Sequence, residues 1–243
     1  MHHRTRIGLA GLVVASLAAC SGGTRDPSPS PLPGGPDVRE FGATGNEPGW
    51  RLAITGETLR LDTDYGERRI VRPLPAPERG EGFVRYASRQ AGELTMTIED
   101  RRCTDDMSGM PHPNTVVVVV DGRTLRGCGG RPASLLEGVE WVVEDLDRGG
   151  IIDRSRVTLE FARDGRLSGR ASCNQYSARW KLTGEGLTIS EASATKRACA
   201  PSLMVQERKF LELLGRTIGF SMDRNGKLVL RAADRAIVTA TRG

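Results

Sequence analysis

The segment VTLEFARDGRLSGRASC, residues 157–173, decides the fold of the C-terminal half of the chain. Val157, Leu159 and Phe161 alternate with polar residues, and this period of two is typical of a strand with one buried face. The Asp-Gly pair at 164–165 tolerates a positive φ and turns the chain back into a second, partly apolar stretch. The segment therefore predicts an antiparallel hairpin that lays one face on a core.

The same signals recur toward the C-terminus. Between turn residues, short apolar stretches predict strands at 139–146, 187–189, 218–222, 228–230 and 237–240. One segment, Ser202–Leu214, instead has apolar residues at helical spacing, namely Leu203, Phe210, Leu211 and Leu214. Pro201 suits the start of this helix and Gly215 its end. We therefore expect residues 131–243 to form an α+β domain, an antiparallel sheet with one amphipathic helix.

Residues 38–130 show strand signals throughout. Alternating or β-branched stretches predict strands at 50–54, 59–61, 83–86, 94–98, 116–120 and 124–126. The run Val116–Val120 is β-branched throughout, so we expect a strand that is covered on both faces. The Asp121-Gly122 pair after it is typical of a tight hairpin turn. This part should form a small all-β barrel or sandwich, and the fold class of the whole chain is mainly β.

The N-terminal residues 1–19 are ordered like a signal peptide. Arg4 and Arg6 precede an apolar run that is too short for a stop-transfer helix. The sequence Leu17-Ala18-Ala19-Cys20 then resembles the lipobox of bacterial lipoproteins, which are cut before the cysteine that receives the lipid. An ordinary secretory signal with a chance cysteine is the alternative. Residues 20–37 are rich in Pro, Gly and Ser, so we expect a tether.

The cysteine count agrees with this interpretation. The chain has five cysteines, and if Cys20 carries lipid an even number remains for an oxidising compartment. Of the three possible connectivities, we predict Cys103–Cys128 and Cys173–Cys199, because each pair lies within one proposed domain. A metal site is the alternative, but no pair has the two-residue gap that is typical of zinc knuckles.

Charge and hydropathy restrict the partners. The formal net charge is +5, and the basic residues are spread along the chain without interleaved aromatic residues, so we expect no nucleic-acid partner. No second apolar run reaches the roughly 20 residues of a membrane helix. The expected membrane contact is therefore the N-terminal lipid.

Candidate catalytic groups are few. Outside the signal peptide the histidine is His112, between two prolines in a segment that reads as a surface loop. Met107, Met110 and His112 offer soft donors on one loop, which makes copper handling an alternative function. Asp105-Asp106 and the Asp145/Asp147 pair offer carboxylates, but the sequence indicates no cleft between them. We expect no enzyme and no cofactor.

Residues 131–243 contain a series of short motifs in a fixed order, namely Trp141, Thr158–Phe161, Asp164–Arg166, Gly169, Cys173–Tyr176, Thr195–Cys199, Gln206-Glu207 and Phe210-Leu211. These motifs are similar to those of the META, or HslJ-like, domain. Ala178 and Trp180 depart from the family, which usually has Gly and Tyr there. The resemblance implies a link to heat-shock and envelope-stress responses, or to lipid-binding pilot lipoproteins of secretion systems, and no reaction.

Residues 38–130 resemble an uncharacterised domain of Gram-negative envelope lipoproteins. The motifs are Phe41, Ala43, Gly45–Trp50, Cys103–Ser108 and Gly122–Cys128. This family brings no assigned activity. Residues 131–138, which contain Pro132, are expected to be the joint between the two domains.

The polar residues of the META-like motifs allow two interpretations. Asn174 and Tyr176 are expected to be structural, and the alternative is a ligand rim that also includes Lys196 and Arg197. The sequence as a whole predicts a non-enzymatic, lipid-anchored binding or stress-protective module at the periplasmic face of the outer membrane. Ser21, rather than Asp, after Cys20 fits that sorting in Gram-negative lipoproteins. Its partner would be an envelope protein or a small ligand, and a lipid-binding chaperone or secretion pilot is a further alternative.

Overall fold

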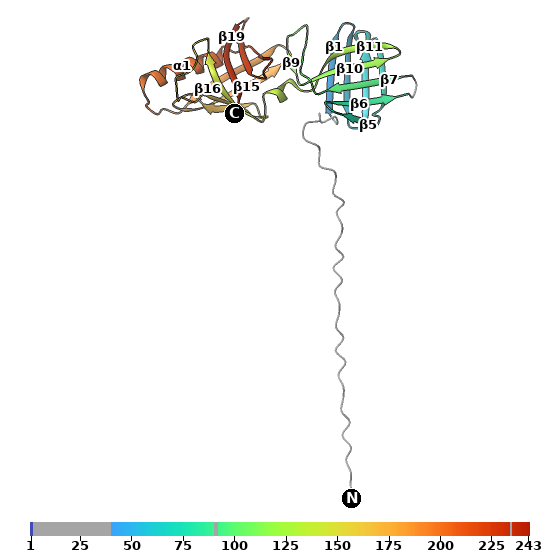
Figure 1. The fold of residues 1–243 in the computed structure, drawn as a ribbon, viewed down its shortest axis with the longest axis horizontal. Coiled ribbons are helices and arrows are strands. Elements are labelled where there is room, and N and C mark those ends of the chain that lie inside the picture. Colours follow the sequence, from blue (N-terminus) through green and yellow to red (C-terminus); the bar gives the residue numbers. More distant parts are fainter. Residues whose placement is uncertain (2–39, 90–91, 234) are drawn as a thin grey trace. The chain divides into compact units, whose positions relative to one another are not determined.

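The computed structural model describes residues 40–89, 92–233 and 235–243, besides Met1. These residues form two large antiparallel sheets, a small two-stranded sheet and a helix, in agreement with the mainly β fold class (Figure 1). The predicted signal peptide, tether and Cys20 lie outside the described residues.

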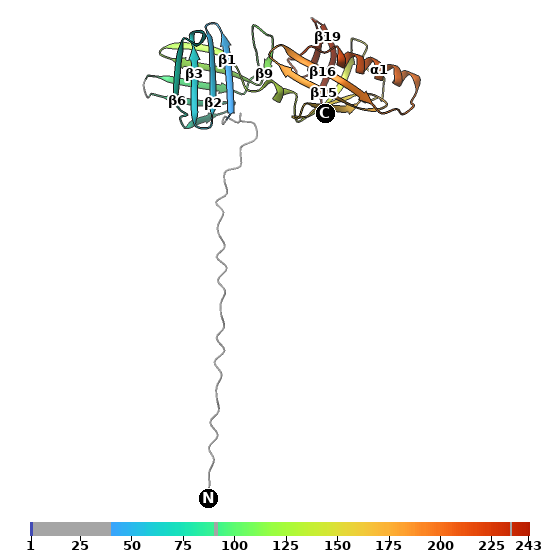
Figure 2. The same cartoon turned by 180° about the vertical axis from the view of Figure 1, so that it is seen from behind.

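The N-terminal sheet has nine antiparallel strands in the order β4-β3-β2-β1-β11-β10-β7-β6-β5. Its strands are β1 (Glu40–Asn46), β2 (Gly49–Thr55), β3 (Thr58–Thr63), β4 (Arg68–Pro73), β5 (Pro77–Gly80), β6 (Phe83–Ser88), β7 (Leu94–Glu99), β10 (Asn114–Val120) and β11 (Arg123–Gly129). The short strands β8 (Cys103–Thr104) and β9 (Pro111–His112) pair separately, and a 3₁₀ turn, η1 (Asp64–Gly66), follows β3. The sheet curls around one apolar cluster, so it is a barrel-like sheet rather than a sandwich of two sheets (Figure 2).

Alternation explains which face of each strand is buried. Along β10, Val116, Val118 and Val120 are fully buried, whereas Val117 and Val119 are only half-buried. The prediction that this strand is covered on both faces is therefore wrong. β-Branched residues also suit the outer face of a strand, so a valine run by itself does not tell whether that face is covered.

The C-terminal sheet has eight antiparallel strands in the order β16-β15-β14-β13-β12-β19-β18-β17. Its strands are β12 (Glu140–Leu146), β13 (Thr158–Phe161), β14 (Arg166–Arg170), β15 (Gln175–Thr183), β16 (Gly186–Ala194), β17 (Gly219–Met222), β18 (Leu228–Ala232) and β19 (Arg235–Arg242). The two edges approach each other where the Leu187 amide donates to the Ile218 carbonyl at 3.1 Å. A 3₁₀ turn, η2 (Pro132–Leu135), leads into this sheet.

Helix α1 (Pro201–Gly215) confirms the predicted Ser202–Leu214 segment within one residue at each end. Pro201 stands in the first turn, where its missing N–H costs nothing. Phe210, Leu213 and Leu214 bury their side chains in the C-terminal cluster, with Trp141 and Leu228 among the sheet residues there. The described part of the chain contains no helix that is long and apolar enough to cross a membrane.

Candidate functional site

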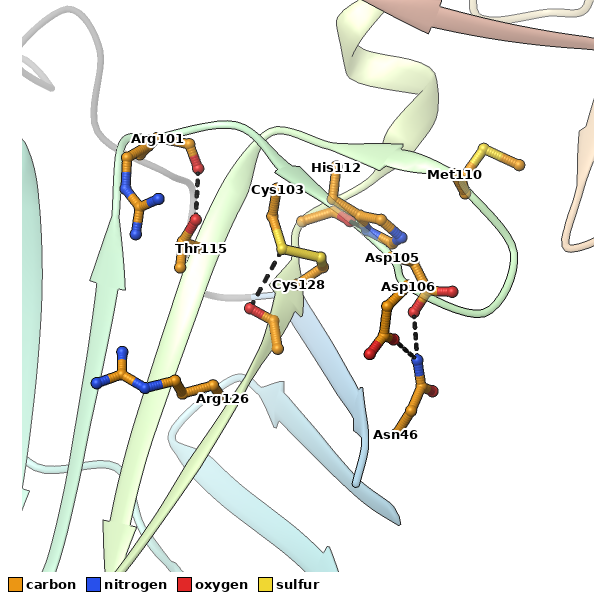
Figure 3. Close-up of a disulfide and its surroundings, with 12 residues drawn as sticks. Asn46, Arg101, Cys103, Asp105, Asp106, Met110, His112, Thr115, Arg126 and Cys128 are labelled. Carbon is orange, nitrogen blue, oxygen red and sulfur yellow. Dashed lines mark hydrogen bonds between the residues drawn. A yellow bond between two sulfur atoms is a disulfide. The ribbon is translucent and has the colours of Figure 1, made fainter. Parts of the chain in front are cut away.

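Three motif segments of the N-terminal sheet, far apart in sequence, meet at one place. The Asn46 amide nitrogen donates to the Asp105 carboxylate at 3.1 Å and also to the Asp106 carboxylate (Figure 3). The Trp50 indole N–H donates to the Arg126 carbonyl at 3.1 Å. We call residues 45–50, 103–108 and 126–128 the motif cluster.

A disulfide joins two of these segments. Cys103 and Cys128 are bonded, and the Cys103 sulfur lies 3.5 Å from the Gly127 carbonyl oxygen (Figure 3). A Cβ atom at Gly127 would collide with the Thr44 backbone. Strands β1 and β11 can therefore approach this closely only with glycine at position 127. The second disulfide joins Cys173 to Cys199, and both pairs are those predicted from the sequence.

A cavity of about 420 Å³ lies beside the motif cluster. Its lining includes Gly45, Gly49, Trp50, Arg51, Tyr65 and Met107. Tyr65 and Met107 are 79% and 80% exposed, which is unusual for apolar side chains of this size. Tyr65 also has φ of +57°, a left-handed conformation that is costly for an aromatic residue. Strain and exposed apolar surface beside a cavity are typical of a binding site.

Charged groups on the neighbouring strands are mostly paired. Asp62 accepts hydrogen bonds from Arg69 at 2.7 Å and from Arg60 at 2.9 Å, and these bonds lower the pKa of its carboxyl. Asp105 is partly buried, which raises its pKa, but hydrogen bonds from Ser108 and Asn46 outweigh burial, so the pKa is lowered. Both carboxylates therefore stay ionised as parts of local networks.

The predicted copper donors do not share one arrangement. Met107 lines the cavity beside Tyr65, and Figure 3 shows the Met110 side chain directed away from the His112 ring. The His112 Nδ1 lies 3.2 Å from the Gly130 carbonyl, which can only accept, so Nδ1 donates to that carbonyl. Cys103 is in a disulfide. Within the residues that the structure describes, no group of three or more His, Cys, Asp or Glu side chains could hold a metal ion.

In the C-terminal sheet, Asn174 lies at the centre of a buried polar network. Glu207 on α1 accepts from the Asn174 backbone N–H at 2.8 Å and from its side-chain nitrogen at 3.0 Å. The Asn174 side-chain oxygen accepts from the Thr195 hydroxyl at 2.7 Å and from the Arg197 N–H at 2.8 Å. Asn174 is 1% exposed and Glu207 is 5% exposed, so this network joins the helix to the sheet rather than facing solvent.

The other predicted rim residues separate into two groups. Tyr176 is buried and its hydroxyl donates to the Thr158 carbonyl at 2.9 Å, and burial raises its pKa. Lys196 and Arg197 are exposed. The four side chains therefore do not line one surface, because Asn174 and Tyr176 use their polar atoms inside the protein.

Gln206 and Glu207 on α1 were noted as META-like motif residues, but no contacts were predicted for them. Gln206 accepts from the Ile152 N–H at 2.7 Å, and it donates to the hydroxyls of Ser155 and Ser172 at 2.9 and 3.0 Å. Both residues lie beside the apolar stripe of α1. Their place in a META-like motif was the one feature of the sequence that pointed to them. Their partners are more than 30 residues away in sequence, so the sequence did not indicate them.

Comparisons with known proteins give one family match and two solved structures. No curated protein matches the chain. One solved structure, titled as the NMR structure of a protein, is 23% identical with a TM-score of 0.37, and the match covers 44% of this chain and 92% of that chain. An NMR structure of a protein from Burkholderia xenovorans is 22% identical with a TM-score of 0.37, covering 46% of this chain and 86% of that one. Residues 134–242 match the model of the META domain family.

Proposed function

We propose that this protein is a non-enzymatic, lipid-anchored module of the cell envelope, held at the periplasmic face of the outer membrane and serving binding or stress protection. The observation that carries the proposal is the use of the cysteines. Cys103–Cys128 and Cys173–Cys199 form two disulfides, so of five cysteines Cys20 is left for the lipid. Disulfides of this kind persist in oxidising compartments such as the periplasm.

The placement of the polar residues supports a role without catalysis. Asn174, Glu207 and Tyr176 serve internal hydrogen bonds, and Asp62 and Asp105 are held in networks with arginine, serine or asparagine. A general acid or base needs a pKa near the working pH, whereas the pKa values of both aspartates are lowered. These groups suit structure better than proton transfer.

Within this function, ligand binding belongs at the motif cluster. The cavity beside it is lined by the exposed Tyr65 and Met107 and by three charged residues, Arg51, Arg69 and Asp62. Arg69 pairs with Asp62, so Arg51 leaves the lining with a net positive charge beside its apolar groups, which suits a small amphiphilic anion.

The anchoring is tested on the protein purified from membranes of a Gram-negative host. Intact mass and peptide mapping without reduction should find an acylated Cys20 and the two disulfides. Cys20→Ala should move the protein from the membrane to the soluble periplasmic fraction, and Ser21→Asp should keep it acylated but shift it to the inner membrane. An unmodified Cys20 in the mature protein would reject the anchor.

The binding site is tested by native mass spectrometry of the same protein. We expect a retained small molecule on the wild type that is lost from the Tyr65→Ala/Met107→Ala variant. Val205→Ala, which removes an exposed apolar side chain on α1, is the matched control and should keep the ligand. A ligand that survives the double substitution would place binding elsewhere.

A further inference from the structure

The outward face of β14 and β15 carries a concentration of positive charge. Side chains alternate along both strands, and the exposed positions include Arg166 and Arg170 on β14 and Arg179 and Lys181 on β15. We call these four residues the basic face. The strand register places them on the same side of the sheet, because Arg166 pairs with Arg179 and Arg170 pairs with Gln175.

The remaining outward positions of the two strands are neutral. They are Ser168, Gln175, Ser177 and Thr183. Ser168 lies directly opposite Ser177, and on the next strand Thr188 and Ser190 lie opposite Lys181 and Arg179. On the other neighbouring strand, β13, the exposed Glu160 lies opposite Ser168 and supplies one carboxylate. The other groups around the four cations are hydroxyl and amide groups, which can donate to an anion, so the face stays net positive.

Arg166 lies directly opposite Arg179, and this arrangement does not help the sheet to fold. Like charges directly opposite each other on antiparallel strands destabilise a sheet. The ion pair from Arg166 to Asp164 is 3.7 Å long, with both side chains about 60% exposed, so it offsets little of the repulsion. In the N-terminal sheet, by contrast, Arg123 meets Asp64 through two hydrogen bonds of 2.9 Å.

We propose that the basic face docks on the phosphate groups of an anionic phospholipid bilayer. The inference rests on the proposed lipid anchor, which would keep the domain close to a membrane. Neighbouring strands lie about 4.8 Å apart and alternate residues about 7 Å apart, so one flat layer of phosphates can meet all four cations. The attraction of basic groups to anionic lipid falls off within a Debye length, so the contact should be lost at high salt.

Lysine labelling can detect this contact. The described chain contains the lysines Lys181, Lys196, Lys209 and Lys227, and Lys181 belongs to the basic face. The mature lipidated protein is reconstituted into vesicles of phosphatidylcholine alone or with phosphatidylglycerol, and an amine-reactive reagent is applied. We expect Lys181 to react at least about fivefold more slowly on the anionic vesicles at low salt. Lys227, which pairs with Glu144, is the internal reference and should react equally on both.

Two double variants separate the basic face from overall charge. Arg166→Ser/Arg179→Ser should remove the protection of Lys181. Arg208→Ser/Arg224→Ser, at exposed positions on α1 and in the turn before β18, changes the net charge equally and should keep it. Thermal unfolding of both variants checks that the fold is intact.

The outcomes also distinguish this inference from the proposed anchor. If Cys20 is acylated and Lys181 is labelled equally on both vesicles, docking by the basic face is rejected and the lipid anchor is retained. Unacylated Cys20 would overturn the anchor, while protection of Lys181 by added anionic vesicles would still support the face. Protection by inorganic phosphate alone, at the same phosphate concentration, would show a small-anion site and overturn docking on a bilayer.

Discussion

Glu207 is a carboxylate on the buried side of α1, 5% exposed, and two hydrogen bonds from Asn174 stabilise it. Hydrogen bonds to a charged group are stronger than those between neutral groups, and losing them leaves a buried acceptor unsatisfied. One asparagine at the start of β15 therefore helps to hold the helix on the sheet.

Asn174→Ala tests this at the level of one residue. The substitution keeps the backbone N–H but removes the side-chain donor to Glu207 and the acceptor for Thr195 and Arg197. We expect the free energy of unfolding to fall by about 3 kcal/mol, measured by urea denaturation. Gln175→Ala, next to it but exposed, is the control and should change stability by less than about 0.5 kcal/mol. If both substitutions lower the free energy of unfolding equally, the Asn174 network does not stabilise the fold.

Two buried tyrosines give a second prediction at this scale. The Tyr176 hydroxyl bonds to Thr158, whereas the Tyr86 hydroxyl has no partner in the part of the chain that the structure describes. Tyr176→Phe should lower the free energy of unfolding by about 1 kcal/mol, and Tyr86→Phe should leave it unchanged or raise it. Calorimetry of both variants decides this, and a loss for Tyr86→Phe as large as for Tyr176→Phe would show that Tyr86 has a bound partner.

At the scale of elements, the sequence predicted the helix and many of the strands, but it missed β1 and β15 inside the two sheets, although their burial alternates. Trp50–Ile54, Leu94–Ile98 and Ile237–Ala240 all lie within strands of the structure. The edge strands β4 and β5 of the N-terminal sheet were missed because they lack a buried face to create a pattern: all four residues of β5 are exposed, and β4 has no fully buried residue. An alternating pattern of apolar residues indicates that one face of a strand is buried. A strand that is held mainly by backbone hydrogen bonds to its neighbour has no such pattern and is not detected.

The candidate sites show the same limit. The cysteine pairs could be predicted from their number and from the proposed domain boundary, and the motif segments 45–50 and 103–108 were noted separately. Their meeting through Asn46 depends on how β1 and the loop after β8 are brought together, which no local pattern indicates. The exposure of Tyr65 and Met107 likewise follows from tertiary structure.

The turn η1 gives a prediction about pH. The Arg123 guanidinium, with help from the Thr63 hydroxyl, lowers the pKa of Asp64 from 3.8 to about 2. Because the folded pKa is the lower one, this pair stabilises the fold above the unfolded pKa, and its contribution is lost as the pH falls from about 4 through 2. Urea midpoints of the wild type and Asp64→Asn should therefore differ at pH 5 and converge toward pH 2.

Asparagine is the suitable replacement because Asp64 has φ of +54°, which Asn tolerates. Arg123→Gln removes the other partner and should give the same pH dependence. A difference between wild type and variant that stays constant from pH 5 to pH 2 would mean that Asp64 does not depend on Arg123.

At the scale of the whole molecule, the two large sheets have separate apolar clusters. One contains Phe41, Trp50 and Met96 and the other contains Trp141, Trp180 and Phe210, and each sheet has its own disulfide. Both clusters lie within one compact unit of the chain. Separate cores favour independent unfolding, whereas a single compact unit favours one cooperative transition.

Removing one disulfide decides between these possibilities. Each disulfide closes a loop of about 25 residues, so its loss should cost about 3 kcal/mol in the sheet that contains it. In the Cys103→Ser/Cys128→Ser variant, hydrogen exchange should accelerate across Val116–Val120 of β10 and stay unchanged across Leu228–Leu230 of β18. The Cys173→Ser/Cys199→Ser variant should show the reverse. If either variant accelerates exchange equally in both strands, the two sheets unfold as one unit and the boundary proposed near residue 131 does not separate independent domains.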